Sequence, residues 1–129
     1  MDSIGDFLTI IRNGIRVSKP FVIAPYSKMN KAIAQSLHKE GFLRGVQEVV
    51  DGAGHQGLKI ELKYVKGESA IHDLKRVSKL SRRAYVGVDE IKPVIGGLGL
   101  SILTTNRGVV SHKEAKRFGV GGEVICTVW

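Results

Sequence analysis

The chain has 129 residues, 43% of them hydrophobic, and carries 20 lysines and arginines against 12 aspartates and glutamates, a formal net charge of +8. The hydrophobic content is sufficient for a packed core and excludes a disordered polycation. A surplus of positive charge repels itself in a folded protein unless a polyanion relieves it. A nucleic acid is therefore the first expected partner and an anionic membrane surface the second. A basic protein without a polyanionic partner is the simpler alternative.

The distribution of charged residues and the cysteine content narrow the choice of partner and of cellular compartment. Residues 1–66 hold ten basic residues and residues 67–129 hold ten, so the charge belongs to the folded surface and not to a tail. No single amphipathic helix concentrates it, and no stretch approaches the roughly 20 apolar residues of a membrane span, which disfavours a membrane partner. Cys126 is the single cysteine. Without a possible internal disulfide or a signal peptide, the chain suits a reducing compartment such as the cytoplasm.

The first half is predicted to contain two helices and three strands. The first helix begins at a cap, Asp2 or Ser3, and ends before Lys19-Pro20, because proline disfavours helix in the preceding residue. Its apolar residues follow helical spacing: Ile4, Phe7, Leu8, Ile11 and Ile15. A second helix runs from the cap Ser27 to Gly41. The strands are expected at 21–24, 43–50 and 58–64, with a flexible hairpin loop at 51–57.

The second half reads as richer in strands. Residues 65–69 are the expected linker, and short apolar runs between glycines and prolines predict strands at 71–77, 84–88, 100–104 and 124–128. Ser111 and Glu114 form a capping box that starts one short helix, which Gly119 ends. The predicted fold is therefore α+β in two small domains. The first, 1–66, has two helices on a short sheet, and the second, 67–129, has mostly antiparallel strands with one short helix.

The segment 75–85 is the most basic part of the chain and contains no acidic residue. It includes Lys79, Arg82 and Arg83, hydroxyls at Ser78 and Ser81, and an aromatic ring at Tyr85. Arginine and lysine pair with phosphates, hydroxyls bond to phosphate or ribose oxygens, and a ring stacks on an unpaired base. This combination favours RNA contact over the alternative, a solvated basic loop.

Two further motifs lie near strand ends. Thr104, Thr105, Asn106 and Arg107 offer adjacent groups that both donate and accept, as ribose hydroxyls and base edges require, although Asn-x-Gly is also typical of a simple turn. Before the last predicted strand come Gly122 and Glu123. Glycine permits close backbone approach, and a carboxylate accepts from a base amino group or braces an arginine. A tight turn with a solvated glutamate is the alternative.

No pattern in the sequence indicates catalysis, a metal or a nucleotide cofactor. The glycines at 96–99 precede a predicted strand, whereas phosphate-binding loops follow a strand and open a helix. The histidines have no metal-ligand spacing: they are His38, His55, His72 and His112. No serine lies in a Gly-x-Ser-x-Gly turn. Cys126 alternates with Val124 and Val128 in a predicted strand, which is typical of an inert buried cysteine.

Several segments together resemble the family of the eighth small-subunit ribosomal protein. The C-terminal ones read GLGLSILTTNRGVV at 97–110, EA at 114–115 and GVGGEVIC at 119–126. The N-terminal ones read DSIGDFLTIIRNG at 2–14, PYSK at 25–28 and KEGF at 39–42, and RVSK at 76–79 matches the basic central stretch. The resemblance spans nearly the whole chain in order, and its closing motif is highly specific.

The resemblance implies a structural protein, not an enzyme, that binds the central domain of small-subunit ribosomal RNA early in assembly and touches neighbouring ribosomal proteins. It implies no cofactor, small-molecule substrate or membrane, and a place in the ribosome of the cytoplasm or of an organelle. The RNA-facing surface of the family corresponds here to Thr104, Thr105, Asn106, Tyr85, Gly122 and Glu123. A neighbouring RNA segment would meet the N-terminal half near Arg12, Lys28 and Lys31.

The chain departs from the family at two places. The family's Ser-Thr-Ser triplet is Thr-Thr-Asn here, so Asn106 offers an amide where the family has a hydroxyl. The family's Pro-Gly after the basic stretch is Leu80-Ser81. On this hypothesis Thr104 and Thr105 bond to ribose or base edges while Arg82, Arg83 and Arg107 neutralise phosphates. Two rival functions are repression of translation, with the same surface bound to a messenger-RNA hairpin, and a nuclease or nucleotide-using activity.

Overall fold

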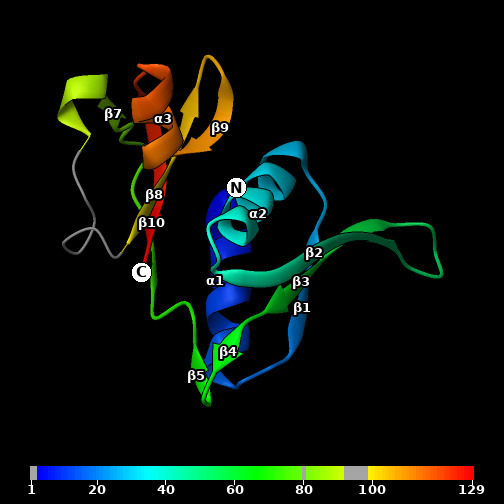
Figure 1. Ribbon diagram of the computed structural model, residues 1–129. Coiled ribbons are helices and arrows are strands. Elements are labelled where there is room, and N and C mark those ends of the chain that lie inside the picture. The colour runs from blue at the N-terminus through cyan, green and yellow to red at the C-terminus, as the bar shows by residue number, and fades with distance from the viewer. Residues whose placement is uncertain (1–2, 80, 92–98) are drawn as a thin grey trace. The chain divides into compact units, whose positions relative to one another are not determined.

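The computed structural model describes residues 3–79, 81–91 and 99–129 (Figure 1). Helices and antiparallel strands occur together, which confirms the predicted α+β class. The chain divides into two compact units, 3–72 and 73–129, each of which is described by itself.

The first unit packs two helices on one face of an antiparallel sheet (Figure 1). Its main elements are α1 (Ser3–Arg16), β1 (Phe21–Pro25), α2 (Lys28–Lys39), β2 (Leu43–Val50) and β3 (Gln56–Leu62). They confirm the two predicted helices and three predicted strands. The strand order is β1-β3-β2, so the strand that is last in sequence lies in the centre. A central β3 has both edges paired, and its residues Leu58, Ile60 and Leu62 are buried against the helices.

The predicted apolar stripe of α1 forms the core contact. Phe7 and Ile11 are fully buried, and Leu8 is 1% exposed. At Gly14 the helix comes so close to the sheet that a Cβ there would overlap Val22 Cγ1 and lie 3.3 Å from Leu62 Cδ1. This close approach requires glycine despite its poor helix propensity, and it lets Val22 pack directly against the helix backbone.

Both ends of α2 have the predicted caps. Ser27 Oγ accepts a hydrogen bond from the Asn30 N–H at 2.9 Å, which satisfies one of the free donors of the first turn. At the other end Gly41 has φ +85°, and the Phe42 N–H donates to Leu37 O at 2.9 Å. This bond across the left-handed glycine is the Schellman arrangement, which ends a helix sharply and turns the chain into β2.

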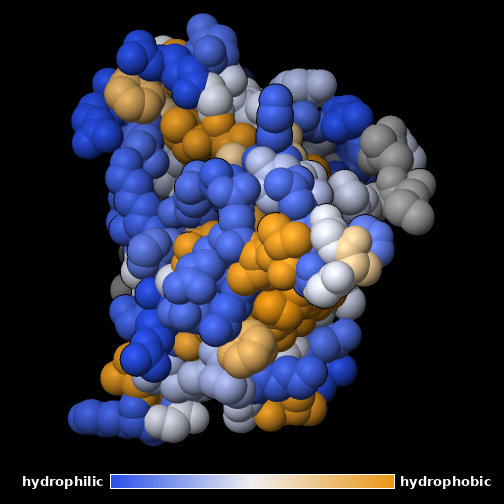
Figure 2. All heavy atoms as spheres, turned by 90° about the vertical axis from the view of Figure 1, so that its right-hand side faces the viewer, coloured by the Kyte–Doolittle hydropathy of each residue, from blue (hydrophilic) through white to orange (hydrophobic). Residues whose placement is uncertain are grey.

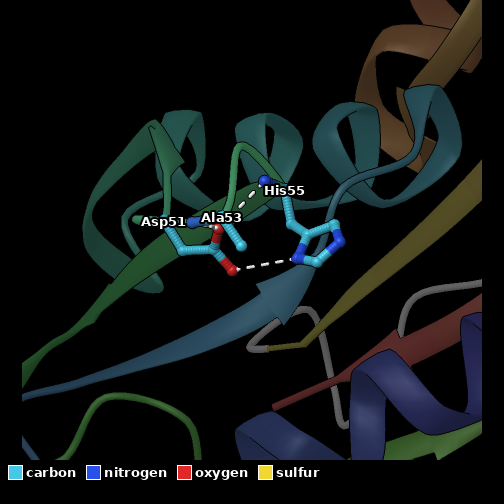
Figure 3. Close-up of polar contacts among 3 residues, drawn as sticks. All are labelled: Asp51, Ala53 and His55. Atoms are coloured by element: carbon cyan, nitrogen blue, oxygen red, sulfur yellow. Dashed lines mark hydrogen bonds and ion pairs between the residues drawn. The ribbon is translucent and has the colours of Figure 1, made fainter.

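The loop between β2 and β3 is organised around one carboxylate, where the sequence had predicted only a flexible connection. Asp51 Oδ1 accepts from the N–H groups of Ala53 at 2.8 Å and His55 at 2.9 Å (Figure 3). Asp51 Oδ2 lies 3.3 Å from His55 Nδ1. The hydrogen bond from the His55 backbone is the main cause that lowers the pKa of Asp51. An aspartate that bonds to the backbone ahead of it stabilises a turn, which explains the order of this loop.

The predicted linker is instead a second small hairpin, so that prediction was wrong. β4 (Tyr64–Val65) pairs with β5 (Glu68–Ser69). The two residues between them, Lys66 and Gly67, have φ values of +53° and +80°. Positive φ at both central positions is the turn type whose twist matches a two-stranded ribbon. The Tyr64 hydroxyl donates to Lys19 O at 2.7 Å, which joins this hairpin to the segment after α1.

The face of the first sheet that the helices leave uncovered carries apolar side chains. On β1, Phe21 and Ile23 are 41% and 53% exposed and alternate with buried Val22 and Ala24. Lys59 Nζ lies 4.5 Å from the centre of the Phe21 ring, so a cation covers part of this surface. Figure 2 shows the side of the molecule at the right of Figure 1, where apolar residues gather among polar ones.

The second unit is a sheet built around its last strand. Its elements are β6 (Leu74–Arg76), β7 (Tyr85–Val86), the 3₁₀ turn η1 (Val88–Glu90), β8 (Leu100–Thr105), β9 (Gly108–Ser111), α3 (His112–Phe118) and β10 (Gly122–Val128). β10 pairs antiparallel with β6, β7 and β8, and β9 pairs with the far side of β8. The four predicted strands are present, β6 and β7 shorter than expected, whereas β9 was not predicted.

The helix α3 has both of its predicted ends. Ser111 Oγ accepts from the Glu114 N–H at 3.2 Å, and Gly119 has φ +70°. On the buried side, Ala115 packs with Leu103, Val110 and Ile91 in one hydrophobic cluster. Val110 belongs to β9, which pairs with β8 and whose second half is buried.

Candidate nucleic-acid interface

The strand register brings together residues that lie far apart in the sequence. Within β10, Glu123 is the direct partner of Tyr85 on β7 and of Thr104 on β8. Directly opposed residues of antiparallel strands place their side chains on the same face of the sheet. Because β7 and the end of β8 flank the start of β10, the basic segment that leads into β7 and the turn after β8 lie on either side of Glu123.

Two glycines allow this arrangement. A Cβ on Gly122 would overlap the carbonyl oxygen of Thr104 and lie 3.0 Å from Thr105 Cγ2. A Cβ on Gly121 would overlap the carbonyl oxygen of Val86 and lie 2.8 Å from the Cα of Gly87. At both positions the backbone that comes close is the protein's own.

The threonine pair lies at the end of β8, and its two hydroxyls differ in environment. Thr105 Oγ1 donates to Gly108 O at 2.9 Å and accepts from the Arg107 N–H at 3.0 Å, so it closes the turn to β9. Thr104 Oγ1 is buried and has no hydrogen-bond partner among the described residues. A buried hydroxyl without a partner costs about 1–3 kcal/mol. Rotation about the Thr104 Cα–Cβ bond moves the hydroxyl to another staggered position.

The turn itself presents Asn106 and Arg107, both exposed. Gly108 has φ +98°, which favours glycine at that position of the turn. The Arg107 guanidinium carbon lies 4.4 Å from the centre of the Phe118 ring at the end of α3. Sequence reasoning missed Phe118. Its signal was an aromatic residue directly before a helix-ending glycine, but its contact with Arg107 comes from the fold.

The carboxylate of Glu123 is already engaged within the protein. Its Oε2 accepts hydrogen bonds from Ser78 Oγ and, at 2.9 Å, from Arg83 Nη1. The hydrogen bond from Ser78 is the largest cause that lowers the pKa of Glu123, and Arg83 acts in the same direction. Ser78 is fully buried. The expectation that its hydroxyl contacts RNA from a surface loop is therefore wrong, because the buried hydroxyl forms hydrogen bonds within the protein.

The rest of the basic segment forms a tight exposed turn. Lys79 and Arg82 exchange backbone hydrogen bonds of 2.9 and 3.0 Å. Their side chains and that of Arg83 are exposed, and Tyr85 is 69% exposed. Of the two residues that replace the family's Pro-Gly, Leu80 lies outside the described residues. The turn therefore offers cations and an aromatic ring beside Glu123.

The predicted N-terminal contacts belong to the other unit. Arg12 is partly buried on α1, and Lys28 is exposed in the first turn of α2. Lys31 Nζ pairs with Glu48 Oε2 at 3.2 Å, and both side chains are partly exposed. The Lys31 cation is thus partly neutralised within the protein, which leaves Lys28 as the more available charge of the two.

Nothing in the described part of the chain indicates a metal centre. No group of three or more His, Cys, Asp or Glu side chains gathers there. Cys126 is fully buried, and burial raises its pKa to about 12, so it is held as a neutral thiol at neutral pH. None of the helices in the described ranges is both long and apolar enough to cross a membrane.

Comparisons with known proteins place this chain in one family. The sequence model of the family described as Ribosomal protein S8 matches residues 2–129. The protein named Small ribosomal subunit protein uS8 of Caldanaerobacter subterraneus subsp. tengcongensis is 50% identical over 129 residues, covering 99% of this chain and 97% of that protein. Its namesake from Ruegeria pomeroyi is 48% identical over 128 residues, covering 99% and 98%. The chain therefore belongs to the ribosomal protein S8 family, a family of structural proteins and not of enzymes.

Proposed function

We propose that this protein is a structural constituent of the small ribosomal subunit that binds the central domain of small-subunit ribosomal RNA and helps its assembly. The observation that carries the proposal is the row of Tyr85, Glu123 and Thr104 across three strands. The basic turn of Lys79 and Arg82 and the turn after β8 flank this row. Membership of the ribosomal protein S8 family supports the ribosomal role. Residence in the cytoplasmic ribosome, beside neighbouring ribosomal proteins, is part of the same proposal.

The proposed interface makes two kinds of contact with RNA: charged contacts to phosphates, and contacts to bases and riboses that depend on shape. Arg82, Arg83 and Arg107 neutralise phosphates, which gives affinity without sequence information. Tyr85 is exposed enough to stack on an unpaired base. The Thr104 hydroxyl gains a partner when it turns towards a ribose or base edge, whereas Thr105, whose proton is used within the turn, offers a free lone pair as an acceptor. The first unit adds phosphate contacts from Arg12 and Lys28.

The direct test compares binding to a central-domain ribosomal RNA fragment with binding to a scrambled duplex of equal length, across a salt series. We expect tight binding to the fragment and a preference that persists as salt rises, because shape and base contacts do not depend on released counterions. Equal and steeply salt-dependent binding to both RNAs would leave only a basic protein and would refute the proposal.

Single substitutions separate the two kinds of contact. Arg82→Ala should weaken binding to both RNAs and reduce the log–log salt slope by about one, because one phosphate contact is lost. Thr104→Ala should cost on the order of 1 kcal/mol for the fragment and leave the slope unchanged. Lys116→Ala, on an exposed position of α3, is the control and should change neither quantity by much. The same slope change in Arg82→Ala and Thr104→Ala would contradict this division.

A further inference from the structure

The basic segment between β6 and β7 is tied at both ends to β10. The Ser78 N–H donates to Val124 O at 3.1 Å, and the Val124 N–H donates to Ala84 O at 2.9 Å. Ser78 Oγ accepts from the Ala84 N–H at 3.2 Å and donates to Glu123 Oε2. The hydroxyl thus joins the beginning and the end of the segment to each other and to the carboxylate, and the described residues between these ends, 79 and 81–83, are exposed.

The two side chains of the Glu123–Arg83 ion pair differ in exposure. The Glu123 side chain is 15% exposed, whereas that of Arg83 is 46% exposed, and Nη1 and Oε2 are 2.9 Å apart. One carboxylate oxygen therefore accepts hydrogen bonds from both the buried serine and the exposed arginine. The group that this pair presents to the surface is the guanidinium. A carboxylate at a surface for a polyanion would weaken binding by repulsion unless it has another effect.

We propose that Glu123 is a positioning residue for RNA binding: together with Ser78 it holds the Arg83 guanidinium in the orientation that meets a phosphate, and its own carboxylate does not touch the RNA. The inference rests on the proposed function. Of the two roles expected for Glu123, contact with a base and support of an arginine, it selects the second and assigns the arginine as Arg83. A guanidinium held in place loses less conformational entropy on binding than a free one, which is the source of the gain in affinity.

The direction in which one substitution changes the affinity for RNA distinguishes a positioning role from a purely electrostatic effect. Glu123→Gln removes a negative charge beside the RNA, so electrostatics alone predicts tighter binding and a steeper salt slope. Positioning predicts weaker binding and a shallower slope, because the neutral amide of glutamine holds Arg83 less firmly than the carboxylate and the phosphate contact weakens. A direct contact of Glu123 with a base predicts weaker binding with no dependence on Arg83.

The experiment is a double-mutant cycle with the full chain and the central-domain fragment across a salt series. We expect Glu123→Gln and Arg83→Ala each to weaken binding about tenfold, the effect of one charge-assisted hydrogen bond, and to lower the salt slope by about one. The double variant should bind within about twofold of Arg83→Ala alone. Glu114→Gln is the matched control, since that carboxylate is also 15% exposed and pairs with an arginine. It should bind like the wild type.

Ser78→Ala provides a second route that leaves both charges in place. It should weaken binding less than Glu123→Gln and have no effect in the Arg83→Ala background. Circular dichroism melts identify variants that fail to fold. Tighter binding by Glu123→Gln, or an equal loss in the presence and absence of Arg83, would overturn the positioning role alone. A wild-type protein that does not distinguish the fragment from the scrambled duplex would overturn the proposed function and this role with it.

Discussion

Two glycines, Gly121 just before β10 and Gly122 at its start, lie close to the backbone of neighbouring segments. Any Cβ at these positions would overlap the carbonyl oxygen of Val86 or Thr104. Both glycines have backbone conformations that other residues also adopt, since neither has a positive φ. Glycine is therefore needed here for space, and the row of Tyr85, Glu123 and Thr104 depends on it.

We expect Gly122→Ala to destabilise the protein by about 2 kcal/mol or more, because the backbone of β8 has to move away from the new methyl group. Gly52→Ala is the matched control. A Cβ there meets nothing within 4 Å and the residue has no positive φ, so its effect should stay within about 0.5 kcal/mol. Urea unfolding measures both, and equal stability of the two variants would contradict the close approach.

At the scale of elements, helix boundaries are set by residues next to them in the chain. Ser27 and Gly41 flank α2, and Ser111 and Gly119 flank α3; both serines accept from a backbone N–H of the first turn, and both glycines have a positive φ. The strands follow a different rule. β9 and the β4–β5 hairpin are too short to show an alternating pattern, and their existence depends on partners and on turn geometry.

Replacement of the α2 cap tests the element directly. Ser27→Ala should lower the free energy of unfolding by about 1 kcal/mol, since the Asn30 N–H loses its acceptor. Ser27→Asp should restore wild-type stability, because an aspartate oxygen accepts the same hydrogen bond and its charge is favourable at a helix N-terminus. Urea unfolding followed by circular dichroism measures both. Equal losses in the two variants would show that the cap is not the cause.

At the scale of the whole molecule, positive charge is spread over two units that each have their own buried residues. The net charge is +8, and among the described residues Arg83 pairs with Glu123 and Lys31 with Glu48. Other cations, such as Lys28, Lys79 and Arg82, lie at exposed positions. Stability should therefore depend on the carboxylates that are paired in the folded state.

Acid should destabilise the protein partly through Glu123. Its folded pKa is lowered from the ordinary value of 4.5, so the folded state binds this proton less tightly than the unfolded state. The stabilisation is present above pH 4.5 and is lost as the pH falls through the lowered pKa. The melting temperature of the wild type should thus fall more steeply between about pH 5 and pH 3 than that of Glu123→Gln. Glu68→Gln, at an exposed position, should keep the wild-type steepness, and identical profiles for all three proteins would refute the linkage.

The sequence by itself determined the elements whose signals are local. Helical spacing in α1, the caps of α2 and α3, and the alternation of β3 all depend on residues within one or two turns of each other, so they can be read without the fold. The family resemblance and the positions of Tyr85, Thr104 and Glu123 were likewise evident from the chain, and these residues do meet across three strands.

Only the tertiary structure decided what those side chains do. Ser78 and Glu123 are 45 residues apart in the sequence, and nothing local to either predicts that the serine is buried or that the glutamate accepts from it and from Arg83. The same holds for the contact of Arg107 with Phe118 and for the unmet hydroxyl of Thr104. The physical reason is that cross-strand register, which depends on the packing of the whole sheet, determines which polar groups meet and which of them remain open to a ligand.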